Sequence, residues 1–493
     1  MPDPFTSADF RRHTLGRYRY TRQRWRVLFA CVDAMGGMVF FLARVSGRIL
    51  LPWKRRKDWP TNQCQQIDPV GNALRGVPPS AATIHPDSSE RHGGRSLQAP
   101  ASHSRGSCLS AGAKPAAHTP KRILLVQLDH LGDAVITTAM LPALRRRYPE
   151  ASIEVLGSPW NREIFEASPE VDRVYVSRRN RFGRAGTFGW PIAAIGWGLR
   201  LRQRRFELAI DVRGEFPLAL ILWLSGARTR LGWNCGGGGF LLTHSPPYVL
   251  GRPEADSRLA LLAEIGIHPS ADEGPWRPRF LPSPSARETA SRMWETLPGR
   301  ADMHPRRIVL HVGSGMAAKQ WPVEHWRELL KRIVGRDDVQ VVLVGAAGDR
   351  IIARRILGNR VRPEIADWTG GLTIAELAAV LEQADLLVGA DSGPAHLAAA
   401  VGTAVVSLFS GTNSVEQWQP NGGRVAVVHN PVPCSPCHRK ECPVAGHPCM
   451  RGLTVARVLK AVEGILAGPT PELGLRGSVH RNLTQRRSEG SPT

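Results

Sequence analysis

The carboxylate of Asp133 has a position in the sequence that is typical of a general base. Asp133 ends the segment Asp129–Asp133 (DHLGD), which directly follows the apolar run Ile123–Leu128. Gly132 permits a tight turn, and a carboxylate after such a turn can face a cleft and accept a proton. A carboxylate at the start of a helix is also a preferred N-cap, so the residues alone leave both roles open.

A second loop has the residues of a phosphate cradle. The segment His311–Pro322 (HVGSGMAAKQWP) places a Gly/Ser turn after an apolar run and Lys319 just before a helix. Backbone N–H groups, the Ser314 hydroxyl and a positive helix end can together hold an anion. The spacing is not that of a P-loop. Lys319 is equally compatible with a solvated surface charge.

Two more loops carry carboxylates after apolar runs. In Gly345–Asp349 (GAAGD), Asp349 is well placed to accept hydrogen bonds from a ribose diol. In Asp391–His396 (DSGPAH), Asp391 and Ser392 can cap the following helix, whose exposed N–H groups then point into a cleft. A purely structural capping role remains open for this second loop.

A cysteine cluster lies near the end of the folded part. Four of the eight cysteines fall within 16 residues, with His438 and His447 alongside, at positions Cys434, Cys437, Cys442 and Cys449. Such clustering in a reducing compartment favours a structural zinc site over disulfides. Reduced, inert thiols and an iron–sulfur cluster are the alternatives.

These loops require a scaffold of alternating strands and helices. Short apolar runs such as Ile123–Leu128 and Val339–Val344 predict strands buried on both faces, and Ala134–Arg147 predicts one helix between strands. The alternation occurs in two sets, separated by the Pro/Ser-rich stretch Pro278–Pro305. We therefore expect an α/β protein with two Rossmann-like domains of parallel strands, facing each other across a cleft with ligands at the carboxyl ends of the strands.

Composition divides the 493 residues into five parts. The stretch 58–120 and the end of the chain are rich in Pro, Ser, Gly and Ala and show no helical or strand period, which predicts disorder. The expected parts are a basic amphipathic segment at 1–57, a disordered linker at 58–120, two Rossmann-like domains at 121–290 and 291–467, and a disordered tail at 468–493. The second of the two domains contains the cysteine cluster of 434–449.

The positive charge is concentrated at the start of the chain. The formal net charge is +23, and residues 1–60 hold 13 Lys/Arg against 4 Asp/Glu. The basic residues flank the apolar stretch Val27–Ala43, whose 17 residues are marginal for a membrane span. A cleaved signal peptide and a buried core helix are alternatives. We favour a helix at an anionic membrane surface.

Three motifs, in one order, resemble glycosyltransferase family 9, the ADP-heptose:lipopolysaccharide heptosyltransferases. They are LxxLGDxxxTTxxLxALRRRYP, HxGSG(x)nKxWP and ADLLVGxDSGPAHLAAAxGT, and the likeness covers residues 120–467. The resemblance implies a GT-B fold and an inverting, metal-independent sugar transfer. It also implies that 121–290 is the acceptor domain and 291–467 the nucleotide-sugar donor domain. It departs from the family at Gln127, where Lys or Arg is frequent, and at Gly315, where some members have Thr.

The resemblance also implies roles for individual residues. Asp133 corresponds to the proposed base, Lys319 to the lysine that contacts the donor diphosphate, and Asp349 to the ribose carboxylate. The remaining donor-binding positions are Ser314, Gly315 (less well matched), Asp391, Ser392, Gly393 and His396. Many family members have a similar cysteine tail and others lack it, which argues against a catalytic role for the cluster.

The expected function follows from these motifs. The donor is an ADP-heptose-like nucleotide sugar, and the acceptor is a lipopolysaccharide core or similar lipid-linked saccharide, reached in the cytoplasm at the inner face of the membrane. No cofactor is expected for catalysis, since the chain contains no D-x-D sequence to bridge a metal and a diphosphate. Alternatives are a transferase for another nucleotide sugar and a non-catalytic nucleotide-binding protein. A nucleic-acid-binding protein is disfavoured, because no aromatic–basic stacking pattern accompanies the charge.

Overall fold

The structure is a computed structural model of the 493-residue chain. It describes residues 33, 35–38, 119–177, 190–269, 276–298, 305–334, 339–358 and 362–468. The two expected sheets are present in these ranges, and both belong to one compact unit. The predicted linker at 58–120 and the tail at 468–493 lie almost wholly outside the described residues.

The first sheet, in what we call the N-terminal lobe, has five parallel strands in the order β3-β2-β1-β4-β5. Ile123 and Leu125 face one side of it with α4, and Leu124 faces the other side with α7. The central strand is therefore apolar along its length. The strands are β1 (Arg122–Val126), β2 (Ser152–Gly157), β3 (Arg173–Val176), β4 (Leu208–Asp211) and β5 (Thr229–Gly232).

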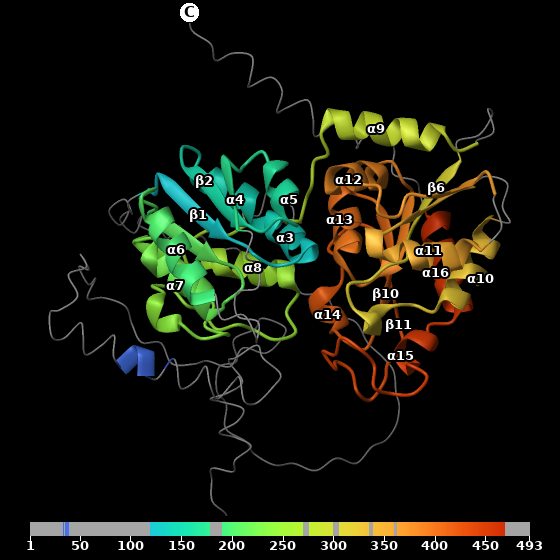
Figure 1. Cartoon of the computed structure of the whole chain (residues 1–493). Coiled ribbons are helices and arrows are strands. Elements are labelled where there is room, and N and C mark those ends of the chain that lie inside the picture. The colour runs from blue at the N-terminus through green and yellow to red at the C-terminus, as the bar shows by residue number, and fades with distance from the viewer. Residues whose placement is uncertain are drawn as a thin grey trace, which may run out of the picture. The chain divides into compact units, whose positions relative to one another are not determined.

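Helices cover both faces of this sheet (Figure 1). They are α3 (Leu131–Thr137), η1 (Thr138–Met140), α4 (Leu141–Arg147), α5 (Arg162–Glu166), α6 (Trp190–Arg202), α7 (Phe216–Leu224), η2 (Gly239–Leu241) and α8 (Glu254–Ala263). The prediction of one helix over Ala134–Arg147 was wrong, because the helix is interrupted by η1. The hydroxyls of Thr137 and Thr138 donate to the carbonyls of Asp133 and Val135, and Pro142 has no N–H to continue the α-helical ladder.

The second sheet, in the C-terminal lobe, has six parallel strands in the order β11-β10-β9-β6-β7-β8. They are β6 (Arg306–His311), β7 (Val339–Val344), β8 (Ile365–Asp367), β9 (Leu386–Ala390), β10 (Ala404–Phe409) and β11 (Val425–His429). Its helical elements are α9 (Pro284–Glu295), η3 (Ala317–Lys319), α10 (Val323–Val334), η4 (Ala347–Asp349), α11 (Arg350–Leu357), α12 (Ile374–Glu382), α13 (Gly393–Val401), α14 (Val415–Trp418), α15 (Pro448–Arg451) and α16 (Val455–Ala467). In α9, Arg287 forms an ion pair with Glu382 of α12, so α9 packs with this lobe.

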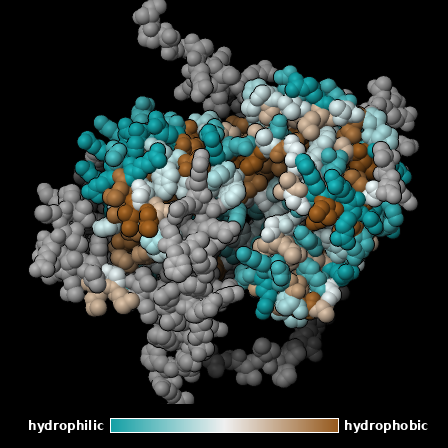
Figure 2. Space-filling view, in the orientation of Figure 1, coloured by the Kyte–Doolittle hydropathy of each residue, from teal (hydrophilic) through white to brown (hydrophobic). Residues whose placement is uncertain are grey.

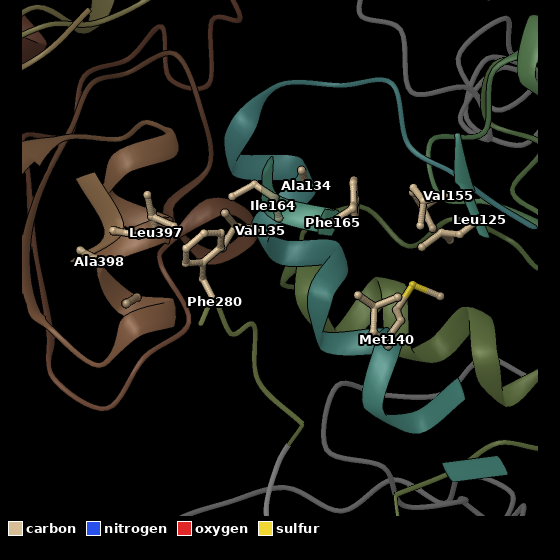
Figure 3. Close-up of a cluster of buried hydrophobic side chains, with 14 of the residues drawn as sticks. Leu125, Ala134, Val135, Met140, Val155, Ile164, Phe165, Phe280, Leu397 and Ala398 are labelled. Carbon is tan, nitrogen blue, oxygen red and sulfur yellow. The ribbon is translucent and has the colours of Figure 1, made fainter. Parts of the chain in front are cut away.

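One hydrophobic cluster extends through both lobes. Val135 of α3 and Phe165 of α5 belong to the same buried cluster as Leu397 and Ala398 of α13. Figure 3 shows Phe280, from the segment that connects the lobes, between these two groups. The positions of α3 and α13 are thus fixed by a common core.

The described part of the N-terminal segment contacts the N-terminal lobe. The amide of Gly238 donates a 2.6 Å hydrogen bond to the carboxylate of Asp33. A Cβ on Gly36 would collide with the ring of Phe240. No helix within the described ranges is both long and apolar enough to cross a membrane.

Candidate active site

Asp133 lies in the first turn of α3, and a short loop connects this helix to the carboxyl end of β1. The N-cap of α3 is His130, and no side chain caps this helix. The interpretation of Asp133 as an N-cap is therefore wrong, because the helix begins at Leu131, three residues earlier than that role requires. Its side chain is 17% exposed, so the carboxylate is partly shielded from water and still accessible.

The Asp133 loop lies directly against the start of α13. A Cβ on Gly132 would come within 3.0 Å of the His396 ring and 3.5 Å of the Gly393 backbone. A Cβ on Gly393 would in turn come within 2.9 Å of the Leu131 side chain. Both glycines are needed for this approach, which brings the DHLGD and DSGPAH loops of the two lobes together.

Lys319 is held by the loop that follows β9. Its ammonium group donates to the Asp391 carboxylate at 2.7 Å and to the Asp391 carbonyl at 2.9 Å. Asn413 donates to the same carboxylate oxygen at 2.8 Å. The Lys319 side chain is 11% exposed, so the interpretation of Lys319 as a solvated surface charge is wrong. Asp391 does not cap α13; Ser392 occupies the N-cap position without a side-chain cap bond.

Two buried histidines lie beside this pair. Burial lowers the pKa of His311 to about 4. Burial also lowers the pKa of His396 to about 4; the neighbouring Asp391 opposes this shift and Lys319 adds to it. The Ser392 hydroxyl lies 3.3 Å from His311 Nδ1. Both rings are neutral at pH 7, and the sequence analysis did not single out His311 as a site residue.

Asp349 folds back over the Gly/Ser turn. Its carboxylate accepts a 2.8 Å hydrogen bond from the Ala346 amide and lies where a Cβ of Gly313 would be. Burial raises the pKa of Asp349, and the bond from Ala346 opposes the rise. The Ser314 hydroxyl accepts from the Met316 amide at 3.2 Å, and a Cβ on Gly315 would meet nothing within 4 Å. The Gly/Ser turn at 313–315 therefore has unoccupied space beside Gly315.

A buried cluster of charged side chains adjoins Asp133. Arg258 of α8 is completely buried; its Nη2 lies 3.7 Å from Asp133 Oδ1, and its Nη1 lies 2.9 Å from Glu254 Oε2. Its guanidinium also lies 5.3 Å from the centre of the Trp233 ring. These residues were not predicted from the sequence as site residues. The available signal was the i,i+4 spacing of Glu254 and Arg258, which is typical of an ordinary surface pair.

Two further residues join this cluster to the C-terminal lobe. Gln417 of α14 donates hydrogen bonds of 2.8 Å to the Tyr248 hydroxyl and to Glu254 Oε1. The Tyr248 hydroxyl donates to Glu254 as well. A pocket of about 350 Å³ adjoins these side chains, between the start of α8 and residues 417–425. The contents of this pocket can therefore touch both lobes.

A second set of charges stands at the end of β4. Arg213 forms ion pairs with Asp129 and with Glu215. Burial raises the pKa of Asp211 to about 7, although the amides of Arg213 and Gly214 donate to its carboxylate and oppose the shift. The carboxyl edge of the first sheet is thus rich in paired, partly buried charge.

The cysteine segment packs on the Lys319 loop. The Ala318 amide donates to the Lys440 carbonyl at 2.9 Å, and His447 Nε2 lies 3.1 Å from the Ala318 carbonyl oxygen. Burial raises the pKa of Cys449, as do the neighbouring thiols Cys442, Cys434 and Cys437. Across the described ranges, no three His, Cys, Asp or Glu side chains are arranged to hold a metal ion. A structural zinc at these cysteines therefore stays a prediction.

Comparison with known proteins supplies the context for this geometry. A family model described as glycosyltransferase family 9 (heptosyltransferase) matches residues 197–447, which is 251 of the 493 residues. Lipopolysaccharide heptosyltransferase 3 of Escherichia coli is 25% identical over 301 residues, covering 59% of this chain and 83% of the relative. Lipopolysaccharide heptosyltransferase 2 of Escherichia coli K12 is 25% identical over 360 residues, covering 70% and 98%.

A solved structure shows the same fold. The ADP-heptose lipopolysaccharide heptosyltransferase II of Escherichia coli superposes with a TM-score of 0.56 at 22% identity, covering 70% of this chain and 98% of that chain. The likeness confirms the α/β fold of GT-B type with parallel sheets that the sequence predicted.

Proposed function

This chain belongs to glycosyltransferase family 9, the heptosyltransferases, and from that premise we propose that it moves a heptose from an ADP-sugar to a lipopolysaccharide core or a similar lipid-linked saccharide, with inversion at the anomeric carbon. The observation that carries the proposal is the approach of the two glycine loops. Because Gly132 packs on His396 and Gly393, Asp133 stands beside the start of α13. A base from one lobe and donor-binding groups from the other thus share one site.

In the proposed reaction Asp133 is the general base. Its carboxylate takes the proton from an acceptor hydroxyl while that oxygen attacks the anomeric carbon of the donor. The bond from that carbon to the diphosphate oxygen breaks on the opposite face, and ADP leaves. One proton moves to Asp133, and one glycosidic bond replaces one glycosyl-phosphate bond. The configuration inverts because the acceptor oxygen attacks on the face opposite the departing diphosphate.

The donor diphosphate is held by groups of the C-terminal lobe. Lys319 gives two N–H bonds to Asp391 and keeps a third N–H for an oxygen of the donor. The start of α13 adds backbone N–H groups whose dipoles favour negative charge. His396 is neutral at pH 7, so it acts as a hydrogen-bonding group rather than a cation. Asp349 is proposed to bind the ribose hydroxyls, and Ser314 and Gly315 the phosphate.

A membrane-bound acceptor suits a surface of the N-terminal lobe. On α6, Ile192 is 75% exposed, Leu199 51% and Ile195 43%, and Figure 2 shows a hydrophobic patch over this helix. Arg200 and Arg202 are exposed near the end of the same helix. Apolar side chains beside arginines suit an anionic lipid surface. We propose that α6 acts with the basic segment 1–57 at the cytoplasmic face of the membrane.

A donor panel tests the function. The purified chain is incubated with ADP-, UDP- and GDP-linked sugars and a heptose-accepting core saccharide, and the product is analysed by mass spectrometry and NMR. We expect transfer from ADP-heptose, an inverted anomeric configuration, and full activity in EDTA with melting followed in parallel. Transfer only from another nucleotide sugar favours the alternative of a non-heptose transferase. Binding of nucleotide without any transfer contradicts an enzymatic role.

A further inference from the structure

Arg258 is the strongest feature that the proposed reaction does not use. It is fully buried in α8, and no atom of its guanidinium makes a hydrogen bond of good geometry, although it forms ion pairs. Burying a guanidinium is costly unless nearby charges compensate it. A buried arginine between two carboxylates therefore calls for a role that an apolar side chain could not fill.

We propose that Arg258 is a positioning residue that keeps Asp133 ionised and aimed at the acceptor, with Glu254 as the competing carboxylate that limits how tightly Asp133 is held. The inference rests on the proposed role of Asp133 as base. Arg258 Nη1 lies 2.9 Å from Glu254 and its Nη2 3.7 Å from Asp133. Glu254 is therefore the closer partner of the guanidinium, and the contact with Asp133 is the weaker of the two.

Charges from every neighbouring element are consistent with this role. Facing the Asp133 turn are Arg258 and Glu254 of α8, His396 of α13, and Asp129 and His130 of its own loop. Asp129 forms an ion pair with Arg213, and burial lowers the pKa of His396 to about 4, so that its ring is neutral. The Arg258 guanidinium is thus a positive charge close to Asp133 whose effect on the carboxylate a variant can measure.

The cluster is also held from the donor side. Gln417 donates to Glu254 Oε1 and to Tyr248, each at 2.8 Å. These bonds fix the carboxylate that shares Arg258 with Asp133. The position of the base is therefore tied to a residue of the C-terminal lobe, without any contact between that residue and Asp133.

The pH profile separates positioning from simple structural support. In Arg258→Met, loss of the cation raises the pKa of Asp133, so the acid limb of kcat/KM moves up by about one pH unit or more. We expect kcat to fall about 10-fold to 100-fold with the donor KM unchanged. Arg258→Lys should restore the acid limb toward wild type and leave kcat low, because the charge returns without the geometry.

Further variants keep the test decisive. Arg230→Met removes another buried guanidinium of the same lobe, one that bonds the Ala227 and Leu241 carbonyls; it should lower the melting temperature and leave the acid limb in place. Should Arg258→Met fail to fold, Glu254→Gln still tests the idea, since loss of the competing carboxylate should move the acid limb to lower pH.

Two outcomes overturn the inference in distinguishable ways. If Asp133→Asn is inactive and the acid limb stays unmoved in Arg258→Met, or in Glu254→Gln where the former does not fold, Arg258 is structural and only this inference fails. If Asp133→Asn turns over normally, the proposed base fails and the role of Arg258 fails with it. ADP binding by calorimetry accompanies each variant to show that the donor lobe is intact.

Discussion

The two lobes hold their site charges in different ways. In the C-terminal lobe, Lys319 and Asp391 form one close pair and the neighbouring histidines are neutral at pH 7. In the N-terminal lobe, Asp133 belongs to a buried group of carboxylates and Arg258 that extends over α3 and α8. The C-terminal lobe, the proposed donor side, thus has fixed hydrogen bonds with little net charge, and the N-terminal lobe, the proposed acceptor side, has the carboxylate that is the proposed base.

The difference fits separate roles of the two lobes in the proposed reaction. Tight pairing fixes geometry, which suits a site that must recognise a nucleotide sugar and let ADP depart. Asp133 shares the Arg258 guanidinium with Glu254, which lies closer to it. Such a shared ion pair leaves the Asp133 carboxylate basic, which suits a residue that must accept a proton.

The largest effect is expected at the base. Asp133→Asn keeps the shape and removes the proton acceptor, so we expect transfer to fall by about 10²–10⁴-fold while ADP binding is retained. Activity with ADP-heptose and calorimetry of ADP measure the two sides separately. Glu166→Gln, an exposed carboxylate of the same lobe, is the control. Near-normal turnover in Asp133→Asn would contradict the role of the base.

The next effect is expected at the donor pair. Lys319→Ala removes a partner of the diphosphate and leaves Asp391 buried without its ammonium, so we expect weaker ADP binding, slower transfer and a lower melting temperature. Adding Asp391→Asn removes the unpaired charge, and the double variant should regain stability without regaining ADP affinity. Unchanged ADP binding in Lys319→Ala would show that the lysine only stabilises the lobe.

A smaller effect is expected in the pH dependence of stability, with opposite signs in the two lobes. His311 and His396 have folded pKa values of about 4, below the ordinary 6.5, so their contribution is complete above pH 6.5 and is lost as pH falls through 4. Asp211 has a raised pKa of about 7, so its contribution is complete below 3.8 and is lost as pH rises through 7.

Thermal melting between pH 4 and 9 distinguishes these contributions. Each unit of pKa shift corresponds to about 1.4 kcal/mol. Both contributions change over the same interval, between about pH 4 and 7, but with opposite slopes. His311→Asn should therefore reduce the loss of stability as pH falls from 6.5 to 4, and Asp211→Asn should reduce the loss as pH rises from 4 to 7. Changes of slope with the same sign in both variants would contradict the contrast between the lobes.

The smallest effect on catalysis is expected from the N-terminal segment. Deleting residues 1–115 should leave a folded enzyme that uses a water-soluble acceptor. It removes the hydrogen bond of Asp33 with Gly238, the N-cap of η2, and the packing of Gly36 on Phe240. Binding to anionic vesicles should weaken, and binding of the full chain should weaken as salt rises. A truncated protein that aggregates or melts much lower would make the segment an extra helix of the fold instead.

The same contrast explains what the sequence could predict. Lys319, Asp349 and Asp391 follow buried strands in short motifs, and the structure places each beside the carboxyl edge of the second sheet. Apolar runs such as Val339–Val344 fix those strands almost to the residue, since a strand buried on both faces has few other ways to satisfy its backbone. Local patterns therefore sufficed for most of the C-terminal lobe.

The N-terminal lobe was harder to predict for a physical reason. Arg258 and Glu254 belong to a helix whose spacing is that of a solvated pair, and only the packing of α8 against α3 buries them. The interruption of the helix after Asp133 was missed as well, because it depends on two threonine hydroxyls bonding back to the helix. Long-range packing leaves no local mark in a single sequence.

The hydrophobic cluster shared by α3, α5 and α13 also limits how such enzymes can be recombined. Lobes that meet only through a ligand can be exchanged between relatives as independent modules. Here Val135, Phe165, Phe280 and Leu397 are parts of one buried interior. A chimera with a foreign C-terminal lobe would therefore inherit a mismatched interface. New donor specificity should be easier to reach by replacing loops such as 313–319 than by exchanging whole domains.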